Sequence, residues 1–537
     1  MLPMKILTAQ QMNEVDRLTT EEFGLPSLVL MENAGLNLYW YLDECFEDLS
    51  SQNFAILCGI GNNGGDGFAL ARQLLQRDIQ PHVYLLSKIE KVSGDARLNL
   101  EAYRKSGGII LEVSESSQWS QIGEKFTGYD IIVDAILGTG ISKPLSGLYL
   151  DVVSTVNTAD AFVLSVDLPS GMFSDSLTGG VPTIQASATV SFTAPKIAHI
   201  LNEDQEAIGD LKVVPIGSPI QLLARSEFDL NLLTHEQVIS WLPHRQISSH
   251  KGHLGHVLVA AGSLGKSGAA VLCGDAALRT GSGLVTVCTP DVVQPVVSSY
   301  QAELMTEGVH STPQGTFALR SVDPVLQLLE GKNAAALGPG LGQESETVDF
   351  VHQIVQKINV PLVLDADALN SFQNCIEKLT NNHKQPLIVT PHPGEFSRLT
   401  GQPVEKILSH KVDLAREFAR ETGVWVVLKS FRTLVAEPNG PVFACPLGNP
   451  GMATAGMGDV LTGVITALLG MAAARKTTSP TDISRAVLSG VYLHSLAGEI
   501  AAAEVGPEAL KAGDVTASLG LAYQDLSDKS LSTRVHR

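Results

Sequence analysis

The chain has 537 residues, 44% of them hydrophobic and 17% charged, a composition that excludes both a disordered chain and a coiled coil. Its 37 basic and 56 acidic residues give a net charge of -19, which opposes binding to nucleic acid or to an anionic membrane surface. This length predicts two to four domains, each large enough to bury its own core.

The six cysteines are scattered and indicate a reducing compartment. They form no C-x-x-C pair and have no histidine neighbours at zinc-ligand spacing. Residues 1–16 lack the basic and apolar pattern of a signal peptide, and no stretch approaches 18 uninterrupted apolar residues. We therefore expect a cytoplasmic protein with neither nucleic-acid nor membrane partners.

Short apolar runs alternate with helical patterns along the chain, which is typical of parallel sheets covered by helices. A helix is expected to begin near Phe68, after a glycine-rich loop. The sequence thus predicts an α/β protein with strands at 54–58, 131–135, 162–167 and 211–216 in the first half, and at 256–261, 334–338, 361–366, 387–390 and 424–429 in the second.

A polar stretch separates the two halves, which do not repeat each other in sequence. It follows Gly217 and ends at Thr234, which can cap a new helix with Glu236 and Gln237 in its first turn. The sequence after Tyr523 is polar and rich in serine, so we expect it to fray. We predict domains at 1–217 and 235–523, a linker at 218–234 and a polar tail at 524–537.

The strongest local signal in the first half is the run of glycines in 59–67, directly after an apolar strand. Such a turn lets backbone N–H groups and a helix N-terminus converge on a phosphate. A turn that binds nothing is the alternative for a lone G-x-G. Here Asn62, Asn63 and Asp66 add polar side chains that a bare turn does not need, which favours a ligand site.

Two further strand ends carry aspartates, Asp134 and Asp167, each followed by a loop with glycine. Because the carboxyl ends of parallel strands open into one crevice, these loops are expected to meet the glycine-rich run. Asp134 alone could be a helix cap or a turn former. Three such signals on one edge favour a binding site.

In the second half, residues 262–267 look like a Walker A loop but are too short, with two residues between the glycines instead of four. A strand end carries two carboxylates, Asp365 and Asp367, and 390–395 presents His392, which on its own could be a satisfied loop residue.

The run 448–459 is the most informative in this half, because it ends in Gly458 and Asp459 before an apolar helical stripe. Backbone N–H groups at that helix start can stabilise a transferring phosphoryl group, and Asp459 can accept the proton of an attacking hydroxyl. The alternative is that Asp459 only caps the helix. Capping leaves the preceding glycine-rich run unexplained.

Residues 8–216 resemble the NAD(P)H-hydrate epimerase domain, also called the YjeF N-terminal domain. The resemblance rests on 8–12, 31–35, 62–67, 133–135 and 166–171 in this order. It implies a Rossmann-like three-layer fold, potassium held by Asn63, Asp134 and Ser170, and Asp167 as the acid or base. Lys143 could pair with a phosphate of the dinucleotide. The implied substrate contacts are Asn62, Asn63, Gly64, Gly65, Asp66, Gly138, Thr139, Gly140, Ile141, Ser142, Lys143, Pro144 and Asp167.

Residues 235–523 resemble the ADP-dependent NAD(P)H-hydrate dehydratase, which has a ribokinase-like fold. The resemblance implies that ADP, with magnesium, phosphorylates the 6-hydroxyl of the S hydrate, and that phosphate then leaves. Ser430–Arg432 and Ala455 depart from the usual family pattern. The implied hydrate contacts are Ala269, Gly340, Gly342, His392 and Asp459, with Asp459 catalytic, and the implied ADP contacts are Lys429, Ser430, Phe431, Arg432, Thr433 and Gly458.

Together the halves predict a metabolite-repair enzyme whose ligands are ADP and the hydrates NADHX and NADPHX, between which no residue discriminates. One alternative is a ribokinase-like kinase for a vitamin-precursor alcohol, fused to a nucleotide-binding domain without catalysis. The lysine-bearing segment 251–255 and the rigid 390–395 segment favour the dehydratase. We also expect a homo-oligomer, because such assemblies are common among enzymes of this kind.

Overall fold

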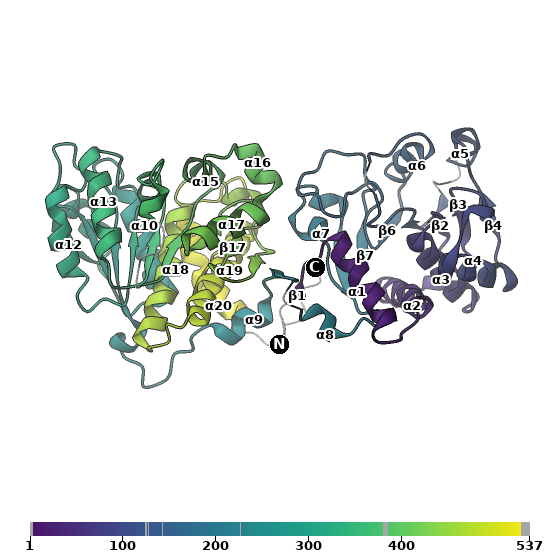
Figure 1. The fold of residues 1–537 in the computed structure, drawn as a ribbon, viewed down its shortest axis with the longest axis horizontal. Coiled ribbons are helices and arrows are strands. Elements are labelled where there is room, and N and C mark those ends of the chain that lie inside the picture. Colours follow the sequence, from purple (N-terminus) through teal and green to yellow (C-terminus); the bar gives the residue numbers. More distant parts are fainter. Residues whose placement is uncertain are drawn as a thin grey trace. The chain divides into compact units, whose positions relative to one another are not determined.

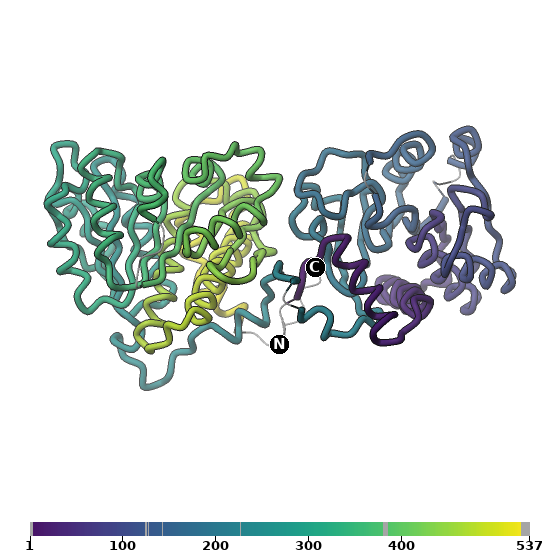
Figure 2. The backbone as a smooth tube through the Cα atoms, in the orientation of Figure 1, coloured from purple at the N-terminus to yellow at the C-terminus, as the bar shows by residue number. Residues whose placement is uncertain are grey.

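The computed structural model describes residues 4–123, 126, 128–141, 143–225, 227–379 and 385–527. Ser142, predicted as a substrate contact, lies outside them. The chain divides into two compact units between Leu230 and Asn231, a division within the range predicted for the linker (Figures 1 and 2). The domain boundaries at 217 and 235 themselves remain predictions.

The smaller unit is built on a sheet with the strand order β4-β3-β2-β5-β6-β7-β8, in which every neighbouring pair is parallel. Its predicted strands are confirmed, each within two residues. Strands β3, β4 and β7 were not predicted. The strands of this unit are β1 (Met4–Lys5), β2 (Phe54–Cys58), β3 (His82–Leu85), β4 (Ile110–Glu112), β5 (Ile131–Ala135), β6 (Phe162–Val166), β7 (Ala188–Phe192) and β8 (Asp210–Val214).

Helices cover both faces of this sheet, as the three-layer prediction requires. Alternate side chains of β2 point to opposite faces: Ile56 packs among residues of α2, α3 and α4, and Leu57 among residues of α5 and α6. The helices are α1 (Ala9–Glu21), α2 (Ser27–Cys45), α3 (Asn62–Leu75), α4 (Gly94–Lys105), α5 (Ser116–Gly123), α6 (Leu148–Val156), α7 (Ile197–Leu201) and α8 (Ile220–Leu223).

Helix α3 begins at Asn62, six residues earlier than predicted. Gly64, Gly65 and Gly67 therefore lie in the first turns of the helix, and Gly59 and Gly61 precede it. Their reason is close packing: a Cβ at Gly64 would stand 2.0 Å from the carbonyl oxygen of Gly59, and one at Gly67 would stand 2.7 Å from the Cβ of Ala135. The helix start is thus held directly against the ends of β2 and β5.

The larger unit contains a sheet in the order β9-β18-β17-β16-β15-β14-β13-β10-β11-β12. From β16 to β12 neighbouring strands are parallel, and β16-β17-β18 form an antiparallel edge. The strands are β9 (Leu230–Leu232), β10 (His256–Ala260), β11 (Leu284–Pro290), β12 (Met305–Val309), β13 (Ala334–Leu337), β14 (Leu362–Leu364), β15 (Leu387–Val389), β16 (Trp425–Leu428), β17 (Leu434–Ala436) and β18 (Val442–Ala444).

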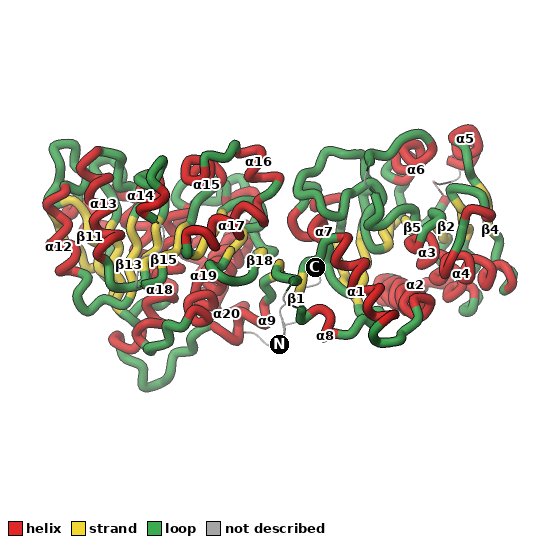
Figure 3. The backbone as a smooth tube through the Cα atoms, viewed as in Figure 1, coloured by secondary structure: helices red, strands yellow, loops and turns green. Residues whose placement is uncertain are grey.

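Helices alternate with these strands along the chain (Figure 3). Helix α9 begins after Thr234, whose backbone N–H donates to the Gln237 side chain at 3.0 Å, as the predicted cap requires. The helices are α9 (His235–Trp241), α10 (Ser267–Thr280), α11 (Gln294–Tyr300), α12 (Val322–Leu328), α13 (Ser345–Lys357), α14 (Asp367–Asn370), α15 (Pro393–Thr400), α16 (Val404–Ser409), α17 (Lys411–Thr422), α18 (Met457–Ala474), α19 (Pro480–Val505) and α20 (Ala512–Ser527).

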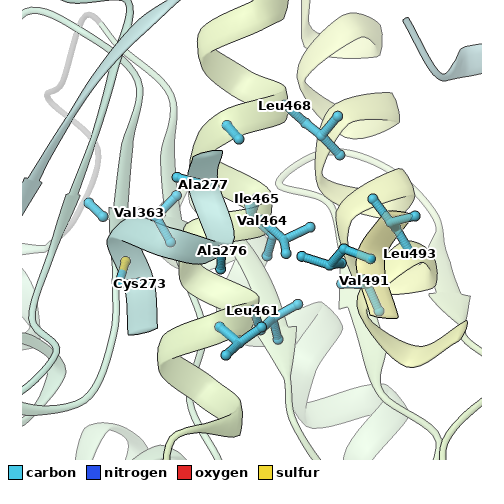
Figure 4. Close-up of a cluster of buried hydrophobic side chains, with 14 of the residues drawn as sticks. Cys273, Ala276, Ala277, Val363, Leu461, Val464, Ile465, Leu468, Val491 and Leu493 are labelled. Atoms are coloured by element: carbon cyan, nitrogen blue, oxygen red, sulfur yellow. The ribbon is translucent and has the colours of Figure 1, made fainter. Parts of the chain in front are cut away.

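Helix α18 lies at the centre of the core of the larger unit. Its side chains Leu461, Val464 and Leu468 pack between those of α10 and α19 (Figure 4). By length and composition α18 and α19 could each cross a membrane, but 72% of each apolar stretch is buried inside the protein. Their hydropathy is therefore explained by their place in the core.

Helix α20 continues through Ser527, four residues beyond the predicted domain end at Tyr523. The helical spacing of Leu519, Ala522 and Leu526 explains this, because all three are buried in the core of the unit. The fraying expected after Tyr523 is therefore wrong for 524–527, and the rest of the predicted tail lies outside the described residues.

Candidate functional sites

The smaller unit has a cavity of about 480 Å³ at the carboxyl ends of β2, β5 and β6. The three strand-end signals therefore meet, as predicted. Gly64 and Gly65 are buried in the first turn of α3, and Lys143 and Pro144 are exposed and do not line the cavity. The predicted contacts that line it are Asn62, Asn63, Asp66, Gly138, Thr139, Gly140, Ile141 and Asp167.

Asp167 forms a buried ion pair with Lys196. The Lys196 Nζ lies 2.5 Å from Asp167 Oδ1, and the lysine side chain is 1% exposed. Burial alone would raise the pKa of Asp167, but the ammonium outweighs burial and lowers it. Asp167 therefore enters the cavity as a carboxylate at neutral pH.

The hydrogen bonds around this pair leave one carboxylate oxygen for the cavity. Ser191 Oγ and the Phe192 N–H donate to Asp167 Oδ1, the oxygen that also faces Lys196. The ammonium uses its remaining two protons on Ser191 Oγ at 3.0 Å and the Phe192 carbonyl at 3.2 Å. Every hydrogen bond that the described residues donate to the Asp167 carboxylate thus goes to Oδ1, and Oδ2 remains available to a ligand.

Asp134 is fully buried on β5 and is held by hydroxyl and amide donors. It accepts from Ser165 Oγ at 2.9 Å, from the Ser170 N–H at 2.8 Å and from Ser170 Oγ at 2.5 Å. Burial raises its pKa in spite of these hydrogen bonds. Among the described residues it has no lysine, arginine or histidine partner within salt-bridge distance, so no cationic side chain balances a negative charge on it.

Asn63 also reaches this region, because a Cβ at Gly138 would stand 3.2 Å from Asn63 Oδ1. Ser170 Oγ in turn accepts from the Leu137 N–H at 2.9 Å. The predicted potassium ligands Asn63, Asp134 and Ser170 thus present hard oxygen atoms near a buried anion. That donor set suits an alkali cation.

Sequence reasoning missed several residues of this cavity, among them the charged Lys196 and Asp16. Lys196 follows β7, one of the strands that were not predicted. It lies in the apolar segment 192–198, where a charged residue needs a partner. Asp16 lies on α1, where its polar neighbours made it look like an ordinary exposed position.

The larger unit has a cavity of about 760 Å³ at the ends of β14, β15 and β16 and the start of α18. Its wall includes the predicted hydrate contacts His392 and Asp459. The predicted nucleotide contacts in its wall are Lys429, Ser430, Phe431, Arg432, Thr433 and Gly458.

At the floor of this cavity Asp365 and Lys429 form a second buried ion pair, with Nζ 2.6 Å from Oδ1. Thr390 Oγ1 donates to Asp365 Oδ1 at 2.8 Å, and Thr462 Oγ1 donates to Oδ2 at 2.9 Å. Burial would raise the pKa of Asp365, but Lys429 outweighs it and lowers the pKa. Lys429 therefore stays charged below the start of α18.

Asp459 stands in the first turn of α18 and is not tied to a cap, since Gly456 is the N-cap residue and has no side chain to donate or accept. Burial, and then the neighbouring carboxylate of Asp365, raise the pKa of Asp459 to about 7. A carboxyl group with such a pKa can take up and release a proton at neutral pH. The capping alternative for Asp459 is therefore not favoured.

His392 is itself a helix cap. Its Nδ1 accepts from the N–H groups of Gly394 at 3.0 Å and Glu395 at 3.3 Å at the start of α15. Burial lowers its pKa, so the imidazole is neutral at physiological pH. The ring is 52% exposed and still lines the cavity, so its structural role and a ligand contact are compatible.

Ala269, Gly340 and Gly342 form a neighbouring surface that does not line the 760 Å³ cavity. A Cβ at Gly340 would stand 3.0 Å from the Cβ of Ala269, and the Gly342 N–H donates to Asp367 Oδ2 at 2.9 Å. Asp367 also raises the pKa of Asp459. The two groups of predicted hydrate contacts are thus close enough for their charges to interact.

Phe431 is 42% exposed at the rim of the cavity, between two cations. Lys411 Nζ and Arg432 Cζ lie 5.7 Å and 5.1 Å from the centre of its ring. The departure from the family pattern at 430–432 therefore adds an aromatic face and positive charge.

Two family models match the chain, one in each unit. The model described as YjeF-related protein N-terminus matches residues 27–198, and that described as NAD(P)H-hydrate dehydratase matches residues 257–519. The first model spans every motif of the epimerase resemblance except 8–12, and the second spans the dehydratase segments from 262 to 459.

Similar proteins match the chain over almost its whole length. The chain is 40% identical to the bifunctional NAD(P)H-hydrate repair enzyme Nnr of Moorella thermoacetica, over 98% of each chain. It is 31% identical to the protein of that name in Escherichia coli, over 98% of this chain and 96% of the relative. Among solved structures, an ADP/ATP-dependent NAD(P)H-hydrate dehydratase from Bacillus subtilis is 32% identical, with a TM-score of 0.47, and covers 55% of this chain and 98% of its own. The chain belongs to the family of bifunctional NAD(P)H-hydrate repair enzymes.

Proposed function

We propose that this enzyme restores NADH and NADPH from their hydrates, with an epimerase in the smaller unit and an ADP-dependent dehydratase in the larger one. The observation that carries the proposal is that each unit holds a cavity with a buried lysine–carboxylate pair and a further carboxylate available to a ligand. Both cavities lie at the carboxyl ends of parallel strands, where α/β enzymes bind their ligands.

In the epimerase site Asp167 serves as the base. Lys196 keeps it ionised, and its Oδ2 is available to accept the proton of the 6-hydroxyl group of the hydrate. The start of α3 supplies backbone N–H groups and the positive end of its dipole, which suit the pyrophosphate of a dinucleotide.

A potassium ion would be held by Asn63, Asp134 and Ser170. The observation that supports this fit is that Asp134 is buried without a cationic side chain at salt-bridge distance among the described residues. When bound, the ion would supply positive charge beside the cavity. Asp134, its hydroxyl donors and Asn63 would fix the strand ends and so orient Asp167.

In the dehydratase site Asp459 takes the proton of the 6-hydroxyl group as its oxygen attacks the terminal phosphorus of ADP. The bond from that phosphorus to the AMP oxygen breaks, and Lys429 and the N–H groups at the start of α18 stabilise the charge. Loss of phosphate from C6 and of a proton from C5 then restores the double bond of the reduced nicotinamide. The proximity of Gly458 to Lys429 supports this arrangement.

The nucleotide is proposed to lie along Lys429, Ser430, Phe431, Arg432, Thr433 and Gly458, with the hydrate against Ala269, Gly340, Gly342, His392 and Asp459. Magnesium would enter with ADP, since Mg²⁺ is commonly held by substrate phosphates and retained waters. Phe431 offers a face on which adenine can stack.

The test incubates the enzyme with mixed R and S hydrates of NADPH, with ADP, magnesium and potassium, and follows the absorbance of reduced nicotinamide. We expect both epimers to be recovered, with one AMP and one phosphate formed per turnover. Recovery of the S form alone would remove the epimerase from the proposal. A stable phosphate ester made from ATP and a vitamin alcohol, without hydrate repair, would favour a kinase.

We also propose that the enzyme works in the cytoplasm as a homo-oligomer. Every cysteine in the chain is a free thiol, which suits a reducing compartment. Light scattering of the purified enzyme tests the assembly, and a mass equal to one chain would contradict it.

A further inference from the structure

Four carboxyl groups and one lysine line the cavity of the smaller unit, so a single cation faces more than one acidic group. Asp95 accepts a hydrogen bond from Ser27 Oγ, and Asp167 is paired with Lys196, whereas Asp16 and Asp66 have no cation within salt-bridge distance among the described residues. Because like charges in a buried site disfavour one another, such a cluster must hold at least one proton at neutral pH. The carboxyl group that holds this proton is a candidate proton donor to the ligand.

Lys196 is not available as a proton donor to a ligand. Its three ammonium protons point to Asp167 Oδ1, Ser191 Oγ and the Phe192 carbonyl, at 2.5, 3.0 and 3.2 Å. It is also buried, with 1% of its side chain exposed. Its role is therefore to keep Asp167 ionised, and the site needs another group to deliver a proton.

Asp16 meets the requirements for that group. It lies on α1 and reaches the cavity wall, and its Oδ1 is buried without a hydrogen-bond partner among the described residues. A buried carboxyl oxygen without a hydrogen-bond partner destabilises the folded protein. The stability of the fold therefore does not explain why an aspartate stands at position 16. The charged groups that face it are Lys196, Asp167 and Asp66.

Asp66 is less suited to the role, because burial and then Asp167 raise its pKa well above the ordinary range and keep it protonated. Burial raises the pKa of Asp16 to about 6, with Lys196 opposing and Asp167 adding to the effect. Asp16 can therefore both release and regain a proton near neutral pH.

We propose that Asp16 is the second proton-transfer residue of the epimerase and acts as the general acid opposite the base Asp167. This inference rests on the proposed function of the smaller unit. Inversion at C6 needs a bond to be broken and remade, and C6 carries both a hydroxyl group and the ring nitrogen N1. A base at the hydroxyl group and an acid at N1 together open the ring without any co-reactant.

Ring opening begins at the 6-hydroxyl group. Asp167 accepts the 6-hydroxyl proton, the oxygen electron pair forms the C6=O bond, and the C6–N1 bond breaks with its electron pair moving to N1. Asp16 delivers its proton to N1 and becomes a carboxylate. After rotation of the aldehyde group, N1 attacks the other face of C6, the proton on N1 returns to Asp16, and Asp167 returns its proton to the oxygen.

The experiment measures epimerisation by the full-length enzyme as a function of pH, for the wild type and for Asp16→Asn, Asp16→Glu and Glu14→Gln. Pure R hydrate is the substrate, and its conversion to S hydrate is followed by chromatography without ADP. Glu14 is the matched control, because it lies on the same helix and pairs with Arg17 outside the cavity.

We expect Asp16→Asn to lower kcat/KM at least about 100-fold, the usual contribution of a general acid. The wild-type rate should fall as pH rises above about 6, where Asp16 loses its proton. That limb should be absent in Asp16→Asn and restored in part in Asp16→Glu. Glu14→Gln should match the wild type.

If Asp16 had a purely structural role, Asp16→Asn would lower the melting temperature. We expect the melting temperature to be unchanged or higher, because the substitution removes a carboxyl group from an acidic cluster. Dehydration of S hydrate by the same preparation serves as an internal control. Full epimerisation by Asp16→Asn with an unaltered pH limb would overturn the inference and leave the proposed function standing. Absence of epimerisation in the wild type would overturn the proposed function itself.

Discussion

The backbone of Gly458 lies against the ammonium group of Lys429: a Cβ at residue 458 would stand 3.0 Å from Nζ and 3.4 Å from Asp365 Oδ2. The start of α18 can approach the buried ion pair this closely only without a side chain. The absence of a side chain at Gly458 therefore lets the N–H groups at the start of α18 lie close to the ammonium group of Lys429.

Replacement of Gly458 by alanine is expected to impair dehydration more than folding. The added methyl group must displace Lys429 or the helix start, and a shift of about 1 Å can lower a rate about 100-fold. Alanine also favours a helix over glycine by roughly 1 kcal/mol, which offsets part of the strain. The rate of S hydrate dehydration and the melting temperature test this. Epimerisation is the control and should stay unchanged, and a wild-type dehydration rate would contradict the prediction.

The dehydratase rate should rise with pH through about 7, because Asp459 must be ionised to accept the hydroxyl proton. Asp459→Asn should lower kcat about 100-fold or more and remove this rise. Because the folded-state pKa of Asp459 lies above its ordinary value, its ionisation opposes folding as pH rises from about 4 to 7. Asp459→Asn should therefore melt higher than the wild type at pH 8. A lower melting temperature there would argue against this account.

The ion pair between Lys196 and Asp167 should stabilise the smaller unit in a pH-dependent way. The pKa of Asp167 is lowered in the folded protein, so its contribution is complete above the ordinary pKa of 3.8 and is lost as pH falls below it. Lys196→Met leaves a buried carboxylate alone and should destabilise the unit by about 3–5 kcal/mol at pH 7. Urea unfolding at pH 7 and pH 3 measures this, and the difference between the variants should shrink at the lower pH. An equal difference at both pH values would mean that packing, and not charge, explains the loss.

Potassium should raise the melting temperature of the smaller unit if Asp134 belongs to a cation site. Ion binding at 100 times the dissociation constant adds about 2.7 kcal/mol to stability. The shift should be absent with Asp134→Asn, whose amide is uncharged, and weaker with lithium as the matched ion. Thermal unfolding in potassium, lithium and tetramethylammonium chloride at equal ionic strength measures it. A shift of the same size for all three salts would remove potassium from the proposal.

A strand with an uninterrupted apolar run was read correctly from the sequence, as β2 illustrates, because burial on both faces leaves a clear signal. The start of α3 was not read correctly, since glycines at 64, 65 and 67 disfavour a helix locally. Only the folded structure shows that close contacts with other segments leave no room for a Cβ at these positions. Strand β7 was missed because its serine and threonine residues, Thr189 and Ser191, dilute the apolar pattern.

The same strand explains the main omission from the candidate site. Ser191 and Phe192 close β7 and direct Lys196 back to Asp167, 29 residues earlier in the chain. No local pattern in the sequence reports a pairing across such a separation. The Asp365–Lys429 pair, whose partners are 64 positions apart in the chain, was hidden for the same reason.

Both units hold a non-glycine residue in the left-handed backbone region at a strand end: Asp167 has φ of 63° and Ala366, next to Asp365, has φ of 51°. Such a conformation costs about 1–2 kcal/mol for any residue with a Cβ. Directed evolution that screens only for heat resistance would therefore enrich glycine at both positions. At residue 366 that change spares every functional side chain, but at residue 167 it deletes the proposed base, so a thermostable library of this enzyme must be screened for turnover as well.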